Sequence, residues 1–80
     1  MSTIFRFKRL RIAIYSNDHP PPHVHVIGPD REARIVIGDE SKPPAVWDFY
    51  GFQRRELIQV LHEVARRQDE LLTAWRTIHG

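Results

Sequence analysis

Three consecutive prolines at positions 20–22 constrain the fold of this chain more than any other feature. Proline fixes φ, lacks an N–H donor and restricts the residue before it, so the run forms a stiff extended segment close to polyproline II. Asp18 and His19 precede the run, and His23 and His25 follow it. Because these four side chains belong to the stiff segment and the strand it leads into, we predict that this stretch is the functional site.

Residues on both sides of the prolines alternate between apolar and polar, which is typical of strands. The alternation first covers residues 4–9 and 10–15, and no glycine separates the two. They form either one long bent strand or a hairpin with a tight turn. After the prolines, residues 23–27 and 32–37 are expected to pair as an antiparallel hairpin, because the residues between them, Gly28-Pro29-Asp30, are typical of turns.

The alternation also assigns a face to each strand residue. His23 and His25 lie on one face of their strand, and Val24 and Val26 lie on the other. Valines prefer the core, so the two histidines are expected to point away from it.

Three further residues are predicted to lie beside these histidines and to contact a substrate. Arg11 and Tyr15 share a face of the second strand, and they flank the histidines if that strand pairs with the third. Arg34 joins the same face if the register allows it. An arginine there could hold a phosphate, and a tyrosine could stack on a base.

The segment after the strands is the least regular. Residues 38–44 are predicted to form a polar loop, and residues 45–50 either a short fifth strand or an irregular turn. Trp47, Phe49 and Tyr50 are predicted to cap the core, because a small domain has few large apolar groups.

From Gln53 onward the apolar residues follow the helical period, with spacings of four and three. The stripe is Leu57, Leu61, Val64, Gln68, Leu71, Trp75 and Ile78. It forms either one long helix or two helices hinged near residues 66–69, and we favour two because Gln68 interrupts the stripe. His62 lies off the stripe and His79 is near the end of the chain, so both are expected to be solvated.

Together these elements predict a single α+β domain over residues 1–80. An antiparallel sheet of four or five strands is followed by one long or two C-terminal helices, packed on one face of the sheet. The chain has no cysteine, which excludes disulfides and thiolate metal sites and suits a reducing cytoplasm. Its apolar runs are far shorter than the ~20 residues that span a bilayer, so no membrane association is expected.

Charge is distributed unevenly along the chain. Residues 1–37 hold six Lys or Arg against three acidic residues, whereas residues 38–80 hold six against seven. A basic half that also contains three histidines favours an anionic partner such as RNA or DNA. The alternative is a solvated strand edge, where Lys and Arg discourage aggregation.

The histidine cluster admits three roles. His23 and His25, together with His19 or Asp18, could ligate a divalent metal ion. The metal would then be the cofactor of the site. They could instead act as general base and general acid in phosphodiester cleavage, with Asp18 and His19 completing a catalytic site. In the third role they pack on the prolines and on Tyr15 and only stabilise the fold.

The stretch from Tyr15 to Val26 resembles the conserved pattern of a bacterial family known as domain of unknown function 4160 (DUF4160). Its core is an acidic residue followed by His-x-Pro-Pro-His-x-His. The similarity continues through Glu32-Ala33, Gly51-Phe52, Glu56-Leu57 and the C-terminal segment from Leu71 to Gly80.

The resemblance implies a small intracellular protein that is often encoded beside a second small protein, one that looks DNA-binding. Such an arrangement implies a toxin–antitoxin-like pair, with this chain as the toxin-like member acting on RNA. The alternatives are a non-enzymatic module that binds the partner protein and nucleic acid, and a divalent-metal-binding domain. The apolar helical stripe could also serve a homo- or hetero-oligomer.

Overall fold

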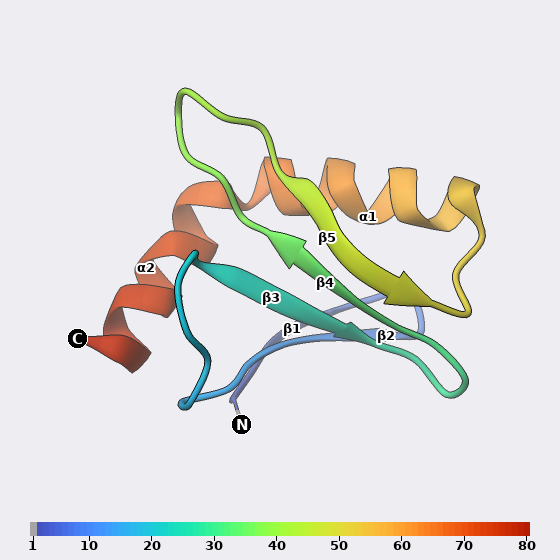
Figure 1. Ribbon diagram of the computed structural model, residues 1–80, viewed down its shortest axis with the longest axis horizontal. Helices are drawn as coiled ribbons and strands as arrows, with labels where there is room; N and C mark the ends of the chain where they lie inside the picture. The colour runs from blue at the N-terminus through green and yellow to red at the C-terminus, as the bar shows by residue number, and fades with distance from the viewer. Residues whose placement is uncertain (1) are drawn as a thin grey trace.

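A computed structural model describes residues 2–80 and contains five strands followed by two helices (Figure 1). The elements are β1 (Ser2–Phe7), β2 (Leu10–Ile14), β3 (His23–Ile27), β4 (Glu32–Val36), β5 (Ala45–Tyr50), α1 (Arg54–Arg66) and α2 (Gln68–His79). The strands form one sheet in the order β1-β2-β3-β4-β5, and every neighbouring pair is antiparallel. The predicted α+β architecture is therefore confirmed.

The first two strands form a hairpin, which resolves the choice left open by the missing glycine. Phe7 pairs with Leu10, so only two residues make the turn. Lys8 has a φ of 56°, the left-handed conformation that two-residue hairpin turns use. The hairpin therefore forms without a glycine, because Lys8 adopts a positive φ that residues other than glycine seldom take.

The three proline residues connect β2 to β3, and the next two strands pair as predicted. Ile12 lies opposite Val26 across β2 and β3, so the chain after the prolines returns beside the strand before them. The β3–β4 turn closes where Gly28 donates its N–H to the carbonyl of Arg31, at 2.9 Å. The predicted hairpin tip at residues 28–30 is confirmed.

Strand β5 is present, but the prediction that its aromatic residues cap the core is wrong. Trp47, Phe49 and Tyr50 are 43%, 52% and 64% exposed. Strand β5 is one of the two outer strands of the sheet, so no strand within residues 2–80 pairs with its free side. Phe52, just beyond the strand, is the aromatic residue that enters the core, with 7% of its surface exposed.

The helical region is divided at Arg67, inside the predicted hinge, so the prediction of two helices is confirmed. Gln68 was the one polar residue in the apolar stripe. Its side-chain amide donates to the carbonyl of Ile37 at 2.9 Å and to that of Lys42 at 3.2 Å. Gln68 thus holds the loop after β4 against the start of α2, which explains a polar group at this position.

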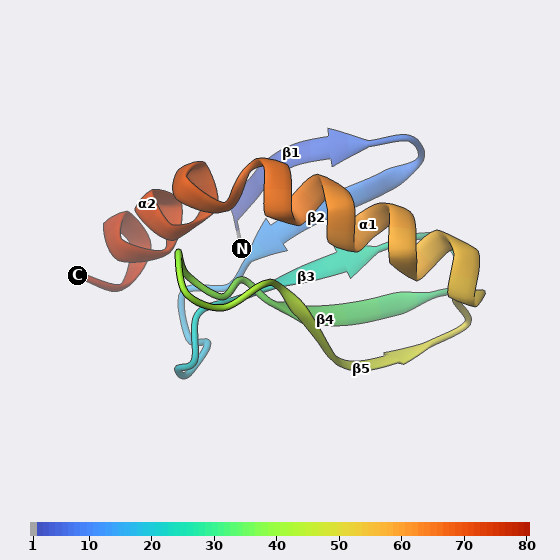
Figure 2. The same ribbon diagram turned by 90° about the horizontal axis from the view of Figure 1, so that it is seen from above.

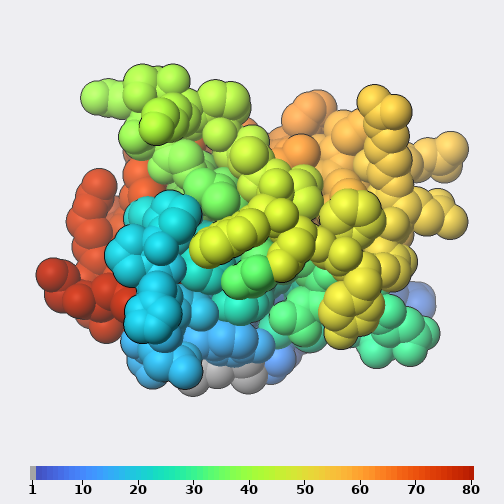
Figure 3. All heavy atoms as spheres, in the orientation of Figure 1, coloured from blue at the N-terminus to red at the C-terminus, as the bar shows by residue number. Residues whose placement is uncertain are grey.

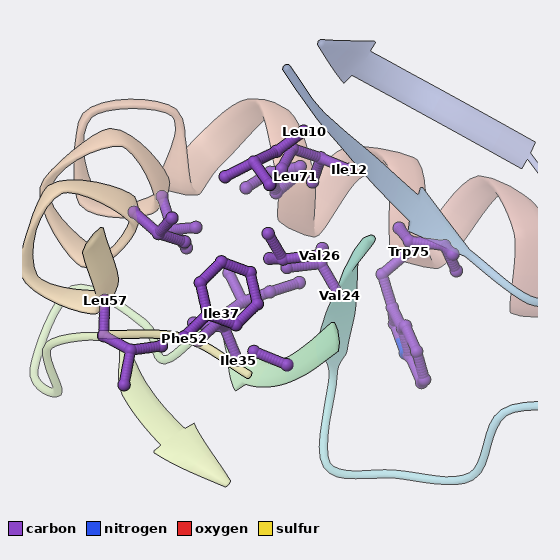
Figure 4. Packing of buried hydrophobic residues seen from close by; sticks show 14 residues of the cluster. Leu10, Ile12, Val24, Val26, Ile35, Ile37, Phe52, Leu57, Leu71 and Trp75 are labelled. Carbon is purple, nitrogen blue, oxygen red and sulfur yellow. The ribbon is translucent and has the colours of Figure 1, made fainter. Parts of the chain in front are cut away.

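The core lies between the helices and one face of the sheet (Figures 2 and 4). Its fully buried members include Ile12, Ile14, Val24, Val26, Ile35, Ile37, Val60, Val64 and Leu71. Alternate residues of β2, β3 and β4 point into this core, so the intervening residues point to the opposite face, here called the open face. No helix within residues 2–80 is long and apolar enough to cross a membrane.

The two histidines of the helices differ from each other. His62 is exposed, as predicted. His79 is not solvated as expected, because its ring stacks on Trp75 with 3.7 Å between the ring centroids. The Trp75 carbonyl also lies 3.0 Å from Nδ1 of His79. The C-terminal turn of α2 is therefore packed rather than frayed.

Candidate functional site

The segment between β2 and β3 folds back so that Asp18 reaches the start of β3. The Asp18 N–H donates to the carbonyl of Tyr15 at 3.1 Å, and the Asp18 carboxylate accepts the Tyr15 N–H at 3.0 Å. These reciprocal bonds form a tight turn of the kind that aspartate favours. The prolines then carry the chain to His23 across a cis Pro20–Pro21 peptide bond. The turn and the prolines together fix where the carboxylate lies.

Asp18, His23 and His25 form a compact cluster on the open face. Nε2 of His25 lies 3.1 Å from both carboxylate oxygens of Asp18. Nε2 of His23 lies 3.7 Å from the Oδ1 atom of the same carboxylate. One potential ligand atom from each residue lies within 4.8 Å of the other two. The cluster therefore presents two imidazole nitrogens and a carboxylate to one point.

A backbone contact fixes the orientation of the His23 ring. Nδ1 of His23 lies 2.9 Å from the carbonyl oxygen of Pro21. A carbonyl oxygen only accepts hydrogen bonds, so Nδ1 carries the proton in this contact. The lone pair of a neutral His23 ring is then on Nε2, which faces Asp18.

The two histidines lie on the opposite face from Val24 and Val26, as the alternation predicted, yet they are not open to solvent. Only 2% of His23 and 6% of His25 is exposed. The rings of Tyr15 and Trp47 cover them, with centroids 4.1 Å from His25 and 5.0 Å from His23. The space-filling view shows the segment between β2 and β3 lying over this part of the sheet (Figure 3).

Sequence reasoning missed the carboxylate beside the second nitrogen of His25. Oε2 of Glu32 lies 3.6 Å from Nδ1 of His25, and this nitrogen is buried without a hydrogen-bond partner among residues 2–80. His25 pairs with Arg34 in the β3–β4 register, so Glu32 is its diagonal neighbour on the same face. The predicted β3–β4 hairpin was the signal that could have identified it, because Glu32 alternates with Arg34 on the same face of β4.

Hydrogen bonds set the charge state of the carboxylates on the open face. Burial acts to raise the pKa of the Asp18 carboxyl, but the hydrogen bonds from His25 and from the Tyr15 N–H outweigh it, and the pKa lies below its ordinary value. The hydrogen bonds from Arg34 likewise hold the pKa of Asp48 below its ordinary value. Both carboxylates are therefore charged at neutral pH.

The other predicted site residues divide into two groups. Tyr15 contacts the cluster through His25, and Arg34 lies beside His25 in the register, as expected. Nε of Arg34 donates to Asp48 at 2.8 Å, and its guanidinium lies over Trp47. Arg11 pairs with Ile27 at the far end of β3, and His19 is exposed and does not belong to the cluster.

Comparison with known proteins identifies a family and nothing more specific. No curated protein and no solved structure matches the chain. A family model described as "Domain of unknown function (DUF4160)" matches residues 10–76. The chain therefore belongs to this family, as the pattern around the prolines indicated.

Proposed function

We propose that this DUF4160 protein binds one divalent transition-metal ion. The ligands are the carboxylate of Asp18 and the Nε2 atoms of His23 and His25. The observation that carries the proposal is the convergence of these three atoms within 4.8 Å of one another.

The separations suit a tetrahedral ion. With ligands about 2.0 Å from the metal, neighbouring ligand atoms of a tetrahedron lie about 3.3 Å apart. The carboxylate lies 3.1 Å from Nε2 of His25 and 3.7 Å from Nε2 of His23. Shifts of a few tenths of an ångström would bring each histidine nitrogen to the ideal separation from the carboxylate, and all three ligand atoms already lie within 4.8 Å of one another.

The groups behind the ligands support the same assignment. Metal-binding histidines generally donate their other ring N–H to a carbonyl or a carboxylate. The Pro21 carbonyl serves this role for His23. For His25, the Glu32 carboxylate lies 3.6 Å from Nδ1, so it would serve this role only after moving a few tenths of an ångström closer.

The donor set indicates the class of metal. Two imidazoles and one carboxylate suit zinc and its neighbours in the first transition row, whereas magnesium and calcium prefer oxygen ligands. Three protein ligands leave one tetrahedral position for water, as in catalytic zinc sites. A metal on Nε2 of His25 would replace the hydrogen that this nitrogen donates to Asp18, so the ring proton would move to Nδ1, which faces Glu32. Because imidazole binds metals in its neutral form, affinity is expected to fall as the pH falls.

Zinc titration of the tag-free protein tests the proposal. We expect one zinc per chain, and a zinc concentration about 100 times the Kd stabilises the fold by about 2.7 kcal/mol. For a domain of this size that raises Tm by about 10–20 °C. His23→Gln should abolish the shift, and His62→Gln on the exposed face of α1 should retain it. Zinc bound at well below one per chain, or an equal shift in both variants, would contradict the proposal.

A second candidate function is that of a toxin-like protein that acts on RNA and is neutralised by a small protein encoded nearby. It is supported by the Asp18–His25 pair, in which a carboxylate orients an imidazole as in general-base catalysis, and by Arg34 beside it. The burial of both histidines weighs against it, because RNA would reach them only if the covering segment moved. Growth inhibition that requires His23 and His25, and that the neighbouring protein relieves, would favour this function.

A further inference from the structure

Three connections meet at the end of the sheet away from the histidine cluster. They are the β1–β2 turn, the β3–β4 turn and the link from β5 to α1 (Figure 1). A hollow of about 320 Å³ is lined by residues from all three, namely Arg9, Pro29, Asp30, Arg31 and Gly51. The side chain of Lys8 also reaches α1, where Nζ donates to Gln59 at 2.8 Å. Segments far apart in the sequence thus form one continuous surface.

This surface, here called the basic end, holds five cations, Lys8, Arg9, Arg31, Arg54 and Arg55, against two carboxylates, Asp30 and Glu56. Only Arg31 is paired, with Glu56 at 2.6 Å. Within residues 2–80, the other four cations form no ion pair, whereas Arg34, Arg66 and Arg67 elsewhere in the chain bind carboxylates. The basic end therefore has unneutralised positive charge next to the N-terminus of α1, which adds to the attraction for an anion.

A second, independent feature adds to this charge. Arg6 and Arg11 lie directly opposite each other across β1 and β2, close to the β1–β2 turn. Like charges in this position destabilise a sheet. An anion bound between the two guanidinium groups would relieve their repulsion, which indicates a ligand with several negative charges.

Exposed aromatic side chains lie at the edge of the same end. Tyr50 immediately precedes Gly51, which packs against Asp30 and Arg31. Tyr50 is 64% exposed and Phe49 is 52% exposed, although the chain has few aromatic residues for its core. With Arg34 they line a second hollow, of about 250 Å³. Aromatic rings beside a row of cations are the two components of a surface for single-stranded nucleic acid.

We propose that the basic end binds single-stranded RNA. The phosphates follow the cations of the β1–β2 turn, the β3–β4 turn and the start of α1, and an unpaired base stacks on Tyr50. Base stacking on Tyr50 favours a single strand over a duplex, whose bases already stack on each other. The surface lies at the opposite end of β3 from the proposed metal ligands, so the two proposals can fail independently.

Fluorescence anisotropy with a labelled oligouridine of about 12 nucleotides tests the proposal in metal-free buffer. Four phosphate contacts on a single strand, one for each unpaired cation, predict a slope of about −2.8 in log K against log salt. The Kd should therefore weaken about 50-fold between about 50 and 200 mM salt. A Kd that stays constant over this range would overturn the proposal.

Charge reversal locates the surface. Arg9→Glu with Arg55→Glu should weaken binding at least tenfold and reduce the slope by about 1.4. The matched control is Lys42→Glu with Arg76→Glu, which changes the net charge equally at exposed positions outside the basic end. An equal loss in both double variants would mean that net charge alone attracts RNA, and would refute the site.

Tyr50→Ala tests the stacked base. It should weaken binding of the single strand about tenfold, and circular dichroism checks that the variant is folded. A duplex of the same sequence should bind more weakly than the single strand, and Tyr50→Ala should not alter its affinity. A preference for the duplex, or an unchanged single-strand affinity in Tyr50→Ala, would overturn the assignment.

Discussion

Replacing Asp18 with asparagine removes the negative charge of the cluster while keeping the shape of the side chain. The asparagine oxygen can still accept the Tyr15 N–H that now binds the carboxylate at 3.0 Å. What is lost is the charge-assisted bond to His25, whose Nε2 lies 3.1 Å from the carboxylate. A hydrogen bond to a charged group contributes about 1.5–3 kcal/mol. Because the asparagine can still form a neutral bond, we expect a loss of about 1–2 kcal/mol in the free energy of unfolding.

The pH dependence distinguishes this effect from general damage. Since the folded pKa of Asp18 lies below its unfolded value, the group stabilises the fold above its unfolded pKa of about 3.9. That stabilisation is lost as the pH falls through the lower, folded pKa. The difference between the wild-type protein and Asp18→Asn should therefore be large at about pH 5 and disappear towards about pH 2.

Urea unfolding of the metal-free protein across this pH range is the assay. Glu40→Gln is the control, because this exposed carboxylate forms no hydrogen bond or ion pair among residues 2–80 and lies outside the cluster. The reasoning is refuted if Asp18→Asn is as stable as the wild-type protein at about pH 5. It is also refuted if the difference stays constant while acid protonates Asp18 in the wild-type protein.

Three further changes test other parts of the structure. Glu32→Gln should weaken zinc binding about 10- to 100-fold by calorimetry if the carboxylate supports His25, and an unchanged Kd would remove it from the site. Gln68→Leu leaves two loop carbonyls without their donor and should cost about 1–3 kcal/mol in urea unfolding, whereas a neutral result would mean that water replaces the amide. Gly51→Ala places a Cβ 2.5 Å from a backbone oxygen at a φ of 79°, so it should lower Tm by several degrees. Gly80→Ala, which has a similar φ but open space around it, is the comparison, and an equal effect would show that backbone strain alone matters.

The sequence by itself determined the elements whose signals are local. Alternation in residues 23–27 and 32–37, with turn residues between them, predicted the β3–β4 hairpin. The spacing of apolar residues after Gln53 predicted a helical C-terminus, and Gln68 within the stripe favoured its division into two helices. The pattern around the prolines predicted both the family and the position of the cluster. The hairpin and the helices follow from the periods of strands and helices, and the position of the cluster follows from the restricted φ of proline. Both properties depend only on residues close together in the chain.

Tertiary structure decided which side chains are covered and which of them meet. Alternation gave the face of His23 and His25 correctly, but it could not show that Tyr15 and Trp47 bury that face. It also could not select Asp18 over its neighbour His19 as the third member of the cluster, because a turn closed by Tyr15 sets the direction of each side chain.

The same limit explains the error at β5. Trp47 and Tyr50 are of the residue types that fill cores, yet they are exposed on β5, one of the two outer strands of the sheet. Strand order and the position of a helix depend on contacts between residues far apart in the chain. Periodicity records which side a residue faces, but only the assembled sheet and helices determine what lies on that side.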